Sequence, residues 1–302
     1  MYGQAILDLA ERNEELMVLS ADLGNSSGLD RFKKAFPDKF VNVGIAEQNL
    51  IGVAAGLAKE GHTVFASSFA PFIAMRASEQ VRMNLGYMQF NVKAVGIGSG
   101  LVMGFLGNSH FGIEDGAVMR AIPDMTVVTP ADCGEIVKAV SAAAEHVGPM
   151  YIRLTGGPNS PVVYTEEYDF VIGKAIKLRE GSDVACVCNG SMVARCLAAA
   201  ELLIAEGISA AVYNFHTTKP LDIACLDEIS ANFRKVLVVE EHSVIGGLGG
   251  AVAEHWISTD SPPKVSILGL PDHFGKTGEY EFLLDRYGLT PEGIVNSVRK
   301  LG

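Results

Sequence analysis

Short apolar runs alternate with amphipathic segments along most of the chain, and this alternation constrains the fold more than any other feature. In the first half, strands are predicted over residues 17–20, 40–43, 63–66, 92–97 and 126–129. Helices are predicted over 2–12, 47–59, 72–84 and 132–145. Compact apolar strands of this kind are typical of a parallel sheet that helices cover on both faces. The pattern therefore predicts an α/β fold.

The alternation pauses in a polar, turn-rich segment and then resumes. The segment 156–169 is rich in Pro, Asn and Ser, and we place a domain boundary there. Further strands are predicted over 183–188, 209–213, 236–239 and 264–268, and further helices over 192–206, 247–256, 277–287 and 291–299. We expect two doubly wound domains in this 302-residue chain. A mainly parallel domain covers 1–160, and a smaller α/β domain covers 170–302.

Charge and hydropathy argue against two classes of partner. The chain has 24 basic and 35 acidic residues, which give a formal charge of −11, and it contains no basic run. Nucleic acid would be repelled by such a surface, so we expect no nucleic-acid partner. No stretch of about 18 apolar residues lacks charge, so we expect no membrane segment. The first twelve residues include Asp8 and Glu11, unlike a signal peptide.

The cysteines indicate neither a zinc site nor a disulfide framework. They are odd in number, they form no C-x-x-C pair, and they lie at Cys133, Cys186, Cys188, Cys196 and Cys225. We interpret them as buried thiols of a protein in the reducing cytoplasm.

Glu47 is the first candidate for chemistry, in the run Val-Gly-Ile-Ala-Glu-Gln-Asn-Leu that ends at Leu50. A carboxylate at a helix start often interacts with the free backbone amides and the helix dipole. The alternative is a buried acid that exchanges a proton with a heterocycle nitrogen. The apolar neighbours favour burial, but spacing alone leaves both interpretations open.

Phe69, Phe72 and His110 form a second group of candidates. Two aromatic residues three positions apart near a helix start are usually core, and the alternative is a platform for a flat ligand ring. His110 is either an ordinary polar loop residue or a ligand contact. Its loop contains glycines at 98, 100, 104, 107 and 112, which would let the backbone approach a ligand closely.

A glycine cluster at 246–250 follows a predicted strand and superficially matches a dinucleotide-binding turn. Its spacing does not fit G-x-G-x-x-G, and no acidic residue is placed to bind a ribose. Tight packing of the following helix explains these glycines, and a nicotinamide dehydrogenase is excluded.

Taken in order, the motifs of this chain resemble the C-terminal half of the transketolase family of thiamine diphosphate enzymes. The matching runs begin at Ser20 (Ser-Ala-Asp-Leu), Val43 (Val-Gly-Ile-Ala-Glu-Gln-Asn), Phe69 (Phe-x-x-Phe), Ile113 (Ile-Glu-Asp-Gly-Ala-Val-Met-Arg), Tyr151 (Tyr-Ile-Arg-Leu), Lys219 (Lys-Pro-Leu-Asp) and Val239 (Val-Glu-Glu-His-Ser-Val-Ile-Gly-Gly-Leu-Gly). The resemblance covers essentially the whole chain. It implies a pyrimidine-binding domain followed by the family's C-terminal domain.

The family's diphosphate-binding half carries a Gly-Asp-Gly motif that this sequence lacks. The resemblance therefore implies the C-terminal subunit of a split transketolase, inactive alone. Its partner would be an N-terminal subunit that binds the cofactor diphosphate and mainly holds the Mg²⁺ (or Ca²⁺), with the cofactor spanning the interface, so no metal ligand is assigned in this chain. We expect a heterotetramer with two copies of each subunit.

The resemblance also implies roles for individual residues. Glu47 corresponds to the glutamate that activates the cofactor at its pyrimidine ring, and Phe69 and Phe72 correspond to the aromatic wall of that pocket. Asp22 and Leu23 match a turn beside the cofactor.

Three further positions resemble substrate contacts of the family. His110 matches a histidine that contacts oxygens of the donor, and it counts with Glu47 as a predicted catalytic residue. Ser26 and Arg153 match positions near a substrate phosphate. Arg153 has an alternative interpretation as an ion-pair partner at a strand end.

Two departures bear on the substrate. Leu106 stands where the family usually has an aspartate that binds a sugar hydroxyl, and Gly98 stands where a substrate-facing histidine is common. A hydroxyl facing leucine would lose its hydrogen bond. The expected reaction is transfer of a two-carbon ketol unit from a ketose to an aldehyde. The alternatives are a carboligase that uses a 2-oxo acid donor, similar to 1-deoxyxylulose-phosphate synthase, and a non-catalytic regulatory subunit.

Overall fold

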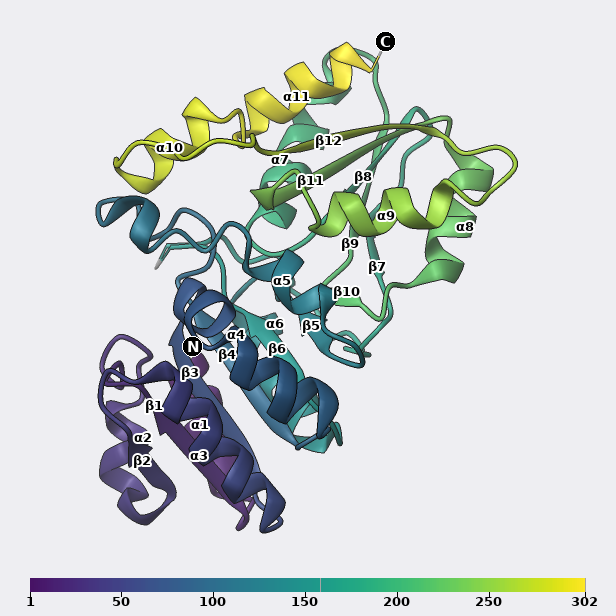
Figure 1. The fold of residues 1–302 in the computed structure, drawn as a ribbon. Coiled ribbons are helices and arrows are strands. Elements are labelled where there is room, and N and C mark those ends of the chain that lie inside the picture. The colour runs from purple at the N-terminus through teal and green to yellow at the C-terminus, as the bar shows by residue number, and fades with distance from the viewer. Residues whose placement is uncertain (158, 302) are drawn as a thin grey trace.

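The computed structural model describes residues 1–157 and 159–301. They form two β-sheets, each with helices on both faces, and the two units pack against each other (Figure 1). The first sheet has the strand order β10-β5-β6-β4-β3-β1-β2. Its strands are β1 (Leu16–Ser20), β2 (Phe40–Asn42), β3 (Thr63–Phe69), β4 (Val92–Ile97), β5 (Thr126–Val128), β6 (Met150–Arg153) and β10 (Thr217–Lys219). All pairs except β10 with β5 are parallel.

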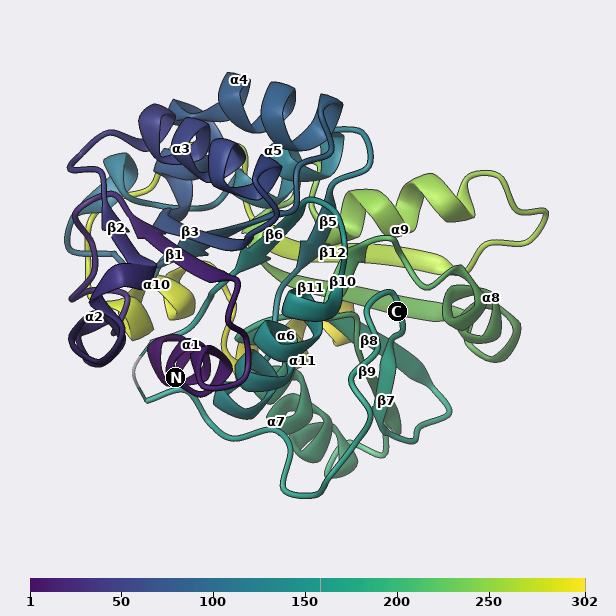
Figure 2. The ribbon, with the colours of Figure 1, turned by 90° about the horizontal axis from the view of Figure 1, so that it is seen from below.

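The central strands of this sheet are buried on both faces because helices cover both faces. One face packs against α1 (Tyr2–Ala10), α2 (Asp30–Ala35) and α6 (Cys133–Glu145). The other face packs against α3 (Glu47–Lys59), the π-helical segments η2 (Phe72–Arg76) and η3 (Val81–Tyr87) with the short α4 (Ser78–Gln80) between them, and α5 (Asp115–Ala121). Figure 2 shows α3 and α4 on one side of the sheet and α1 and α6 on the other.

The second sheet has the order β12-β11-β8-β9-β7, and only its edge strand β7 is antiparallel. Its strands are β7 (Ile176–Arg179), β8 (Val184–Cys188), β9 (Ala210–Asn214), β11 (Lys235–Ser243) and β12 (Lys264–Leu270). Helices α7 (Met192–Ile204), α10 (Tyr280–Arg286) and α11 (Pro291–Lys300) pack on one face, and α8 (Ile223–Asn232) and α9 (Leu248–Trp256) pack on the other. The predicted α/β fold with two helix-covered sheets is confirmed. No helix in the described ranges is long and apolar enough to cross a membrane.

The two sheets are joined by more than the linker. After β9 the chain returns to the first sheet, where β10 lies antiparallel to β5 at the outer edge. The Thr129 amide also donates to the His216 carbonyl, 2.7 Å away. The domain limits 1–160 and 170–302 therefore stay a prediction, because three residues from the second range complete the first sheet.

Some predicted elements differ from those observed. The single helix expected over 72–84 is a chain of wide turns, in which the Ala77 amide donates to the Phe72 carbonyl five residues back. The 277–287 helix begins only at Tyr280. The strands β7 and β10 and the helices α2, α5 and α8 were not predicted. The strand β6 was given no range, although Arg153 was placed at a strand end. Cys133 corrects the prediction of buried thiols, because it is exposed at the start of α6, and Cys225 is partly exposed. Position 133 lies in the first turn of α6, beyond the packed face of that helix.

Candidate active site

Glu47 is the first residue of α3 and lies buried at its N-terminus, with 1% of its surface exposed. The Ser68 hydroxyl donates to Oε1 over 3.1 Å, and the Arg76 guanidinium donates to Oε2 over 2.9 Å. Helix α3 begins without a side-chain cap, so this carboxylate bonds to β3 and η2 rather than to its own helix. The capping interpretation of Glu47 is therefore not favoured, and a buried acid facing a site is.

Three rings meet where β3 ends. The centroids of Phe69 and Phe72 are 5.9 Å apart, and that of His110 lies 5.6 Å from Phe69 and 5.1 Å from Phe72. All three side chains are partly exposed. The guanidinium carbon of Arg76 stands 4.1 Å from the centroid of Phe72, which connects the rings to Glu47. The structure thus brings together four of the predicted residues around one partly open surface.

Asp22 and Leu23 follow β1, whose end lies beside the end of β3 in the parallel register. Asp22 has φ +59°, a left-handed conformation that Asp tolerates better than most residues. Asn42 stabilises this turn, because its Oδ1 accepts from the Asp22 amide and its Nδ2 donates to Asp22 Oδ1, both over 3.0 Å. The Leu23 amide donates to Ser20 Oγ. The turn therefore lies at the carboxyl end of the parallel strands, the same end at which the rings meet.

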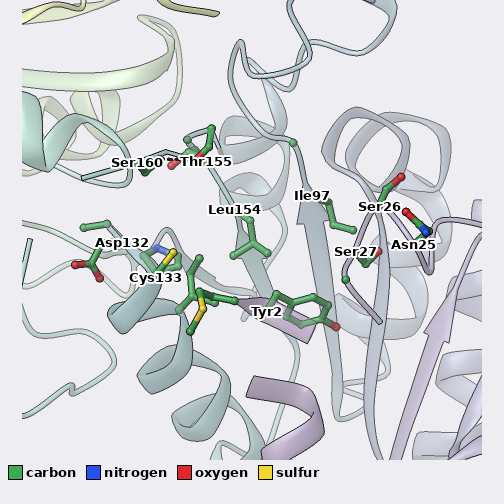
Figure 3. Close-up of a pocket in the computed structure, with 18 residues that line it drawn as sticks. Tyr2, Asn25, Ser26, Ser27, Ile97, Asp132, Cys133, Leu154, Thr155 and Ser160 are labelled. Carbon is green, nitrogen blue, oxygen red and sulfur yellow. Dashed lines mark hydrogen bonds between the residues drawn. The ribbon is translucent and has the colours of Figure 1, made fainter. Parts of the chain in front are cut away.

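Ser26 lines a cavity of about 570 Å³ at the same end of the sheet (Figure 3). Side-chain hydroxyls and amides dominate its polar lining, together with the backbone at Gly98, Gly156 and Gly157. Asp132 is the one carboxylate among the described lining residues. Its oxygens accept from the amides of Glu135, Val163 and Tyr164. No described lining residue has a cationic side chain.

Arg153 lies apart from these residues, buried at the end of β6 with 3% exposure. Its Nε donates to Asp115 over 2.9 Å, and its NH2 donates to the carbonyls of Gly112 and Glu241, each over 2.8 Å. Arg153 does not line the Ser26 cavity. The geometry favours the ion-pair interpretation, and the phosphate role of Arg153 stays a prediction.

The sequence interpretation missed Arg76, which contacts both Glu47 and Phe72. Arg76 lies four residues after Phe72, a spacing that places two side chains on one helical face. That spacing could have shown the pair. Among the described residues, no three His, Cys, Asp or Glu side chains cluster in a way that could hold a metal ion.

Two family models match this chain. Residues 1–157 match the pyrimidine-binding domain of transketolase, and residues 173–294 match the transketolase C-terminal domain. A protein of Methanocaldococcus jannaschii, provisionally named a transketolase C-terminal section, is 42% identical over 299 residues. The match covers 98% of this chain and 93% of that relative.

Two further matches bear on the reaction and the assembly. The 1-deoxy-D-xylulose-5-phosphate synthase of a Synechococcus species is 33% identical over 99% of this chain, which corresponds to 46% of the synthase. A solved structure described as a split gene transketolase, an inactive β4 tetramer, superposes with a TM-score of 0.90 at 44% identity. That match covers 99% of this chain and 96% of the solved one.

Proposed function

Because the chain belongs to the transketolase family, we propose that it is the C-terminal subunit of a split, thiamine diphosphate-dependent transketolase. The reaction is transfer of a two-carbon ketol unit from a ketose donor to an aldehyde acceptor. The observation that carries the proposal is the buried Glu47 carboxylate, which Arg76 connects to the three rings of Phe69, Phe72 and His110.

The proposed partner is an N-terminal subunit that binds the diphosphate and Mg²⁺ (or Ca²⁺), in a heterotetramer. The two matching models belong to the family's pyrimidine-binding and C-terminal domains, and the sequence has no Gly-Asp-Gly run for a diphosphate site. The similar solved chain is described as split and as inactive in its β4 form, which supports the need for a second subunit.

The residues present fit the pyrimidine ring of the cofactor. An aminopyrimidine offers a hydrogen-bonding edge and two flat faces, which suit a carboxylate beside aromatic rings. Glu47 provides the carboxylate, and Phe69 and Phe72 provide the apolar surface. The side chain of Arg76 is 48% exposed, so it can leave Glu47 without unpacking the core. When bound, thiamine diphosphate supplies the nucleophilic carbon for the transfer.

The residues of this chain have separate tasks in the proposal. Glu47 holds and exchanges a proton at the ring nitrogen that faces it, and its burial excludes competing water. His110, whose Nδ1 lies 2.9 Å from Ser109 Oγ, offers its other nitrogen to donor oxygens. Asp22 and Leu23 would lie beside the cofactor, and Ser26, which lines the cavity, would lie near a substrate phosphate.

A carboligase with a 2-oxo acid donor is the second candidate. Leu106 is 40% exposed in the loop of His110 and offers no hydrogen bond to a sugar hydroxyl. A 2-oxo acid carries fewer hydroxyls, and a synthase that is similar to this chain supports this reaction class. A non-catalytic subunit is the third candidate, and the placement of Glu47 with His110 argues against it.

The test is a thiamine fluorescence titration with Mg²⁺ on this chain alone and with its diphosphate-binding partner. We expect tight binding only in the mixture, followed by turnover that depends on a ketose. Release of CO₂ from pyruvate without ketose turnover would favour the carboligase. Micromolar binding by the chain alone would contradict the split site, and no binding with the partner bound would favour the regulatory subunit.

A further inference from the structure

The loop that carries His110, residues 98–112, is held along its length by the second half of the chain. In Figure 1 this loop leaves the end of β4 and reaches α10 in the second half of the chain. The Gly278 amide donates to the Gly104 carbonyl over 3.1 Å, and Asn108 Nδ2 donates to the Gly275 carbonyl over 2.8 Å. The middle of the His110 loop is therefore fastened to the segment before α10.

Glu241, near the end of β11, fastens the beginning of the His110 loop. It is 1% exposed, and its Oε1 accepts from the Leu101 amide over 2.7 Å. Its Oε2 accepts from the Tyr280 hydroxyl over 2.8 Å and from the Ser191 hydroxyl. Gly100 has φ +75°, and a Cβ there would overlap the carboxylate, so the loop backbone lies directly against Glu241.

The residues after Glu241 fasten the other end of the loop. The Ser243 amide donates to the Ile113 carbonyl over 2.7 Å, and the Ala117 amide donates to His242 Nε2 over 3.2 Å. The end of β11 therefore contacts the chain on both sides of His110. Two anchored ends restrict the positions that the histidine ring can take against Phe69 and Phe72.

We propose that Glu241 is a positioning residue for His110, so that the C-terminal half sets the geometry of a site built on the first half. A buried carboxylate is costly unless hydrogen bonds satisfy it, and three donors from three segments do so here. Loss of the carboxylate would leave the Leu101 amide without its acceptor and would release the start of the loop. The inference rests on the proposed function only in giving His110 a catalytic task.

Glu240 provides a matched control. It is the preceding residue, it is 2% exposed, and its oxygens accept from the amides of Leu248 and Gly249 at the start of α9. It thus has the same chemistry and burial as Glu241 but bonds to a helix of the second half. A change specific to the His110 loop must appear on substitution of Glu241 and not of Glu240.

Hydrogen–deuterium exchange on the isolated chain tests the inference without any cofactor or partner. In Glu241→Ala we expect amide exchange in peptides covering 99–112 to accelerate at least tenfold, while peptides of α8 keep their rates. Glu241→Gln should restore most of the protection because its amide oxygen can accept from Leu101. Glu240→Ala should leave the loop unchanged. Unchanged loop exchange in Glu241→Ala, or equal acceleration in the loop and α8, would overturn the proposal.

A milder variant guards against loss of folding. Tyr280→Phe removes one donor to Glu241 and keeps the ring, and we expect a roughly threefold acceleration confined to the same peptides. If Glu241→Ala does not fold, unchanged exchange of the same peptides in Tyr280→Phe would overturn the proposal.

Turnover of the assembled two-subunit enzyme is the second readout. We expect Glu241→Ala to lower kcat at least tenfold while thiamine diphosphate affinity stays unchanged, because Glu47, Phe69 and Phe72 are not part of the loop. An unchanged kcat with a mobile loop would contradict the positioning role. If wild type itself shows no thiamine-dependent turnover, the proposed function fails, and the exchange result still decides whether Glu241 holds the loop.

Discussion

The Glu47 carboxylate lies 2.9 Å from the guanidinium of Arg76, which pairs a fully buried acid with a side chain at the surface. The two side chains differ in mobility. Glu47 cannot move without opening the start of α3, whereas the Arg76 side chain lies at the surface against the ring of Phe72. Glu47 therefore stays in place while Arg76 can be displaced. This suits an acid whose ion-pair partner is replaced by a ligand ring on binding.

Glu47→Gln should lower kcat of the assembled enzyme on the order of 1,000-fold, because the amide keeps the shape but cannot exchange a proton. Thiamine diphosphate affinity, measured by fluorescence titration, should change little. Activity close to wild type would contradict the role given to Glu47.

Arg76→Gln should lower the free energy of unfolding of the isolated chain by about 1–3 kcal/mol, because a buried carboxylate loses its charged partner. Urea denaturation measures this change. The control is Arg82→Gln, since Arg82 is exposed and its one hydrogen bond among the described residues is to the neighbouring Met83 in η3. Equal decreases in the free energy of unfolding for the two substitutions would show that the Glu47–Arg76 ion pair does not stabilise the chain.

Arg153→Met should lower the free energy of unfolding by about 3–5 kcal/mol, because Asp115 would remain buried without its cation. A second variant, Asp115→Asn combined with Arg153→Met, should recover part of this loss. If unfolding is unaffected and only KM for a phosphorylated substrate rises, the phosphate role of Arg153 is supported instead.

Glu135 should make stability depend on pH. Burial raises the pKa of Glu135 to about 7. Hydrogen bonds from Ala131, Asn214 and Tyr164 lower this pKa, but the effect of burial is larger. Between pH 4.5 and about 7 the folded chain keeps a proton that the unfolded chain releases, so the free energy of unfolding decreases as pH rises.

The decrease from Glu135 amounts to about 3 kcal/mol across this range. Urea denaturation of wild type and Glu135→Gln at matched pH isolates it, because other groups cancel. One such group is His216, whose pKa burial lowers to about 4 and whose effect has the opposite sign. A difference between the two proteins that does not change with pH would contradict this prediction.

Cys133 should be the fast-reacting thiol of the folded chain. It is exposed, whereas Cys186, Cys188 and Cys196 are buried, and burial raises the pKa of Cys225 to about 12. A chromogenic disulfide reagent should show one rapid equivalent that Cys133→Ser removes and Cys225→Ser leaves. Two rapid equivalents in wild type would show that Cys225 is also accessible.

The elements predicted best from sequence are those whose pattern is local. The helix over 47–59 and the strand over 92–97 were predicted with their observed limits, because an apolar face or a continuous apolar run marks each of them. The short strand Thr217–Lys219 carries no such pattern. Its place depends on the exposed edge of β5, which lies about 90 residues earlier in the chain.

The candidate site divides in the same way. Glu47, Phe69, Phe72 and His110 were found from motifs. The three rings meet in space, and Arg76 connects them to Glu47. The hydrogen-bond network around Glu241 was not predicted. Its donors belong to Leu101, Ser191 and Tyr280, which are distant from one another in sequence. Burial of Arg153 was equally invisible, since a strand-end arginine looks the same whether it pairs inward or faces solvent.

The return of β10 to the first sheet also affects how the chain is made. A ribosome must synthesise more than two thirds of the protein before Lys219 is available to cover the edge of β5. Until then the growing polypeptide displays an open strand edge, which is a template for wrong pairing with other chains. The first sheet is therefore completed only after residue 219 has left the exit tunnel.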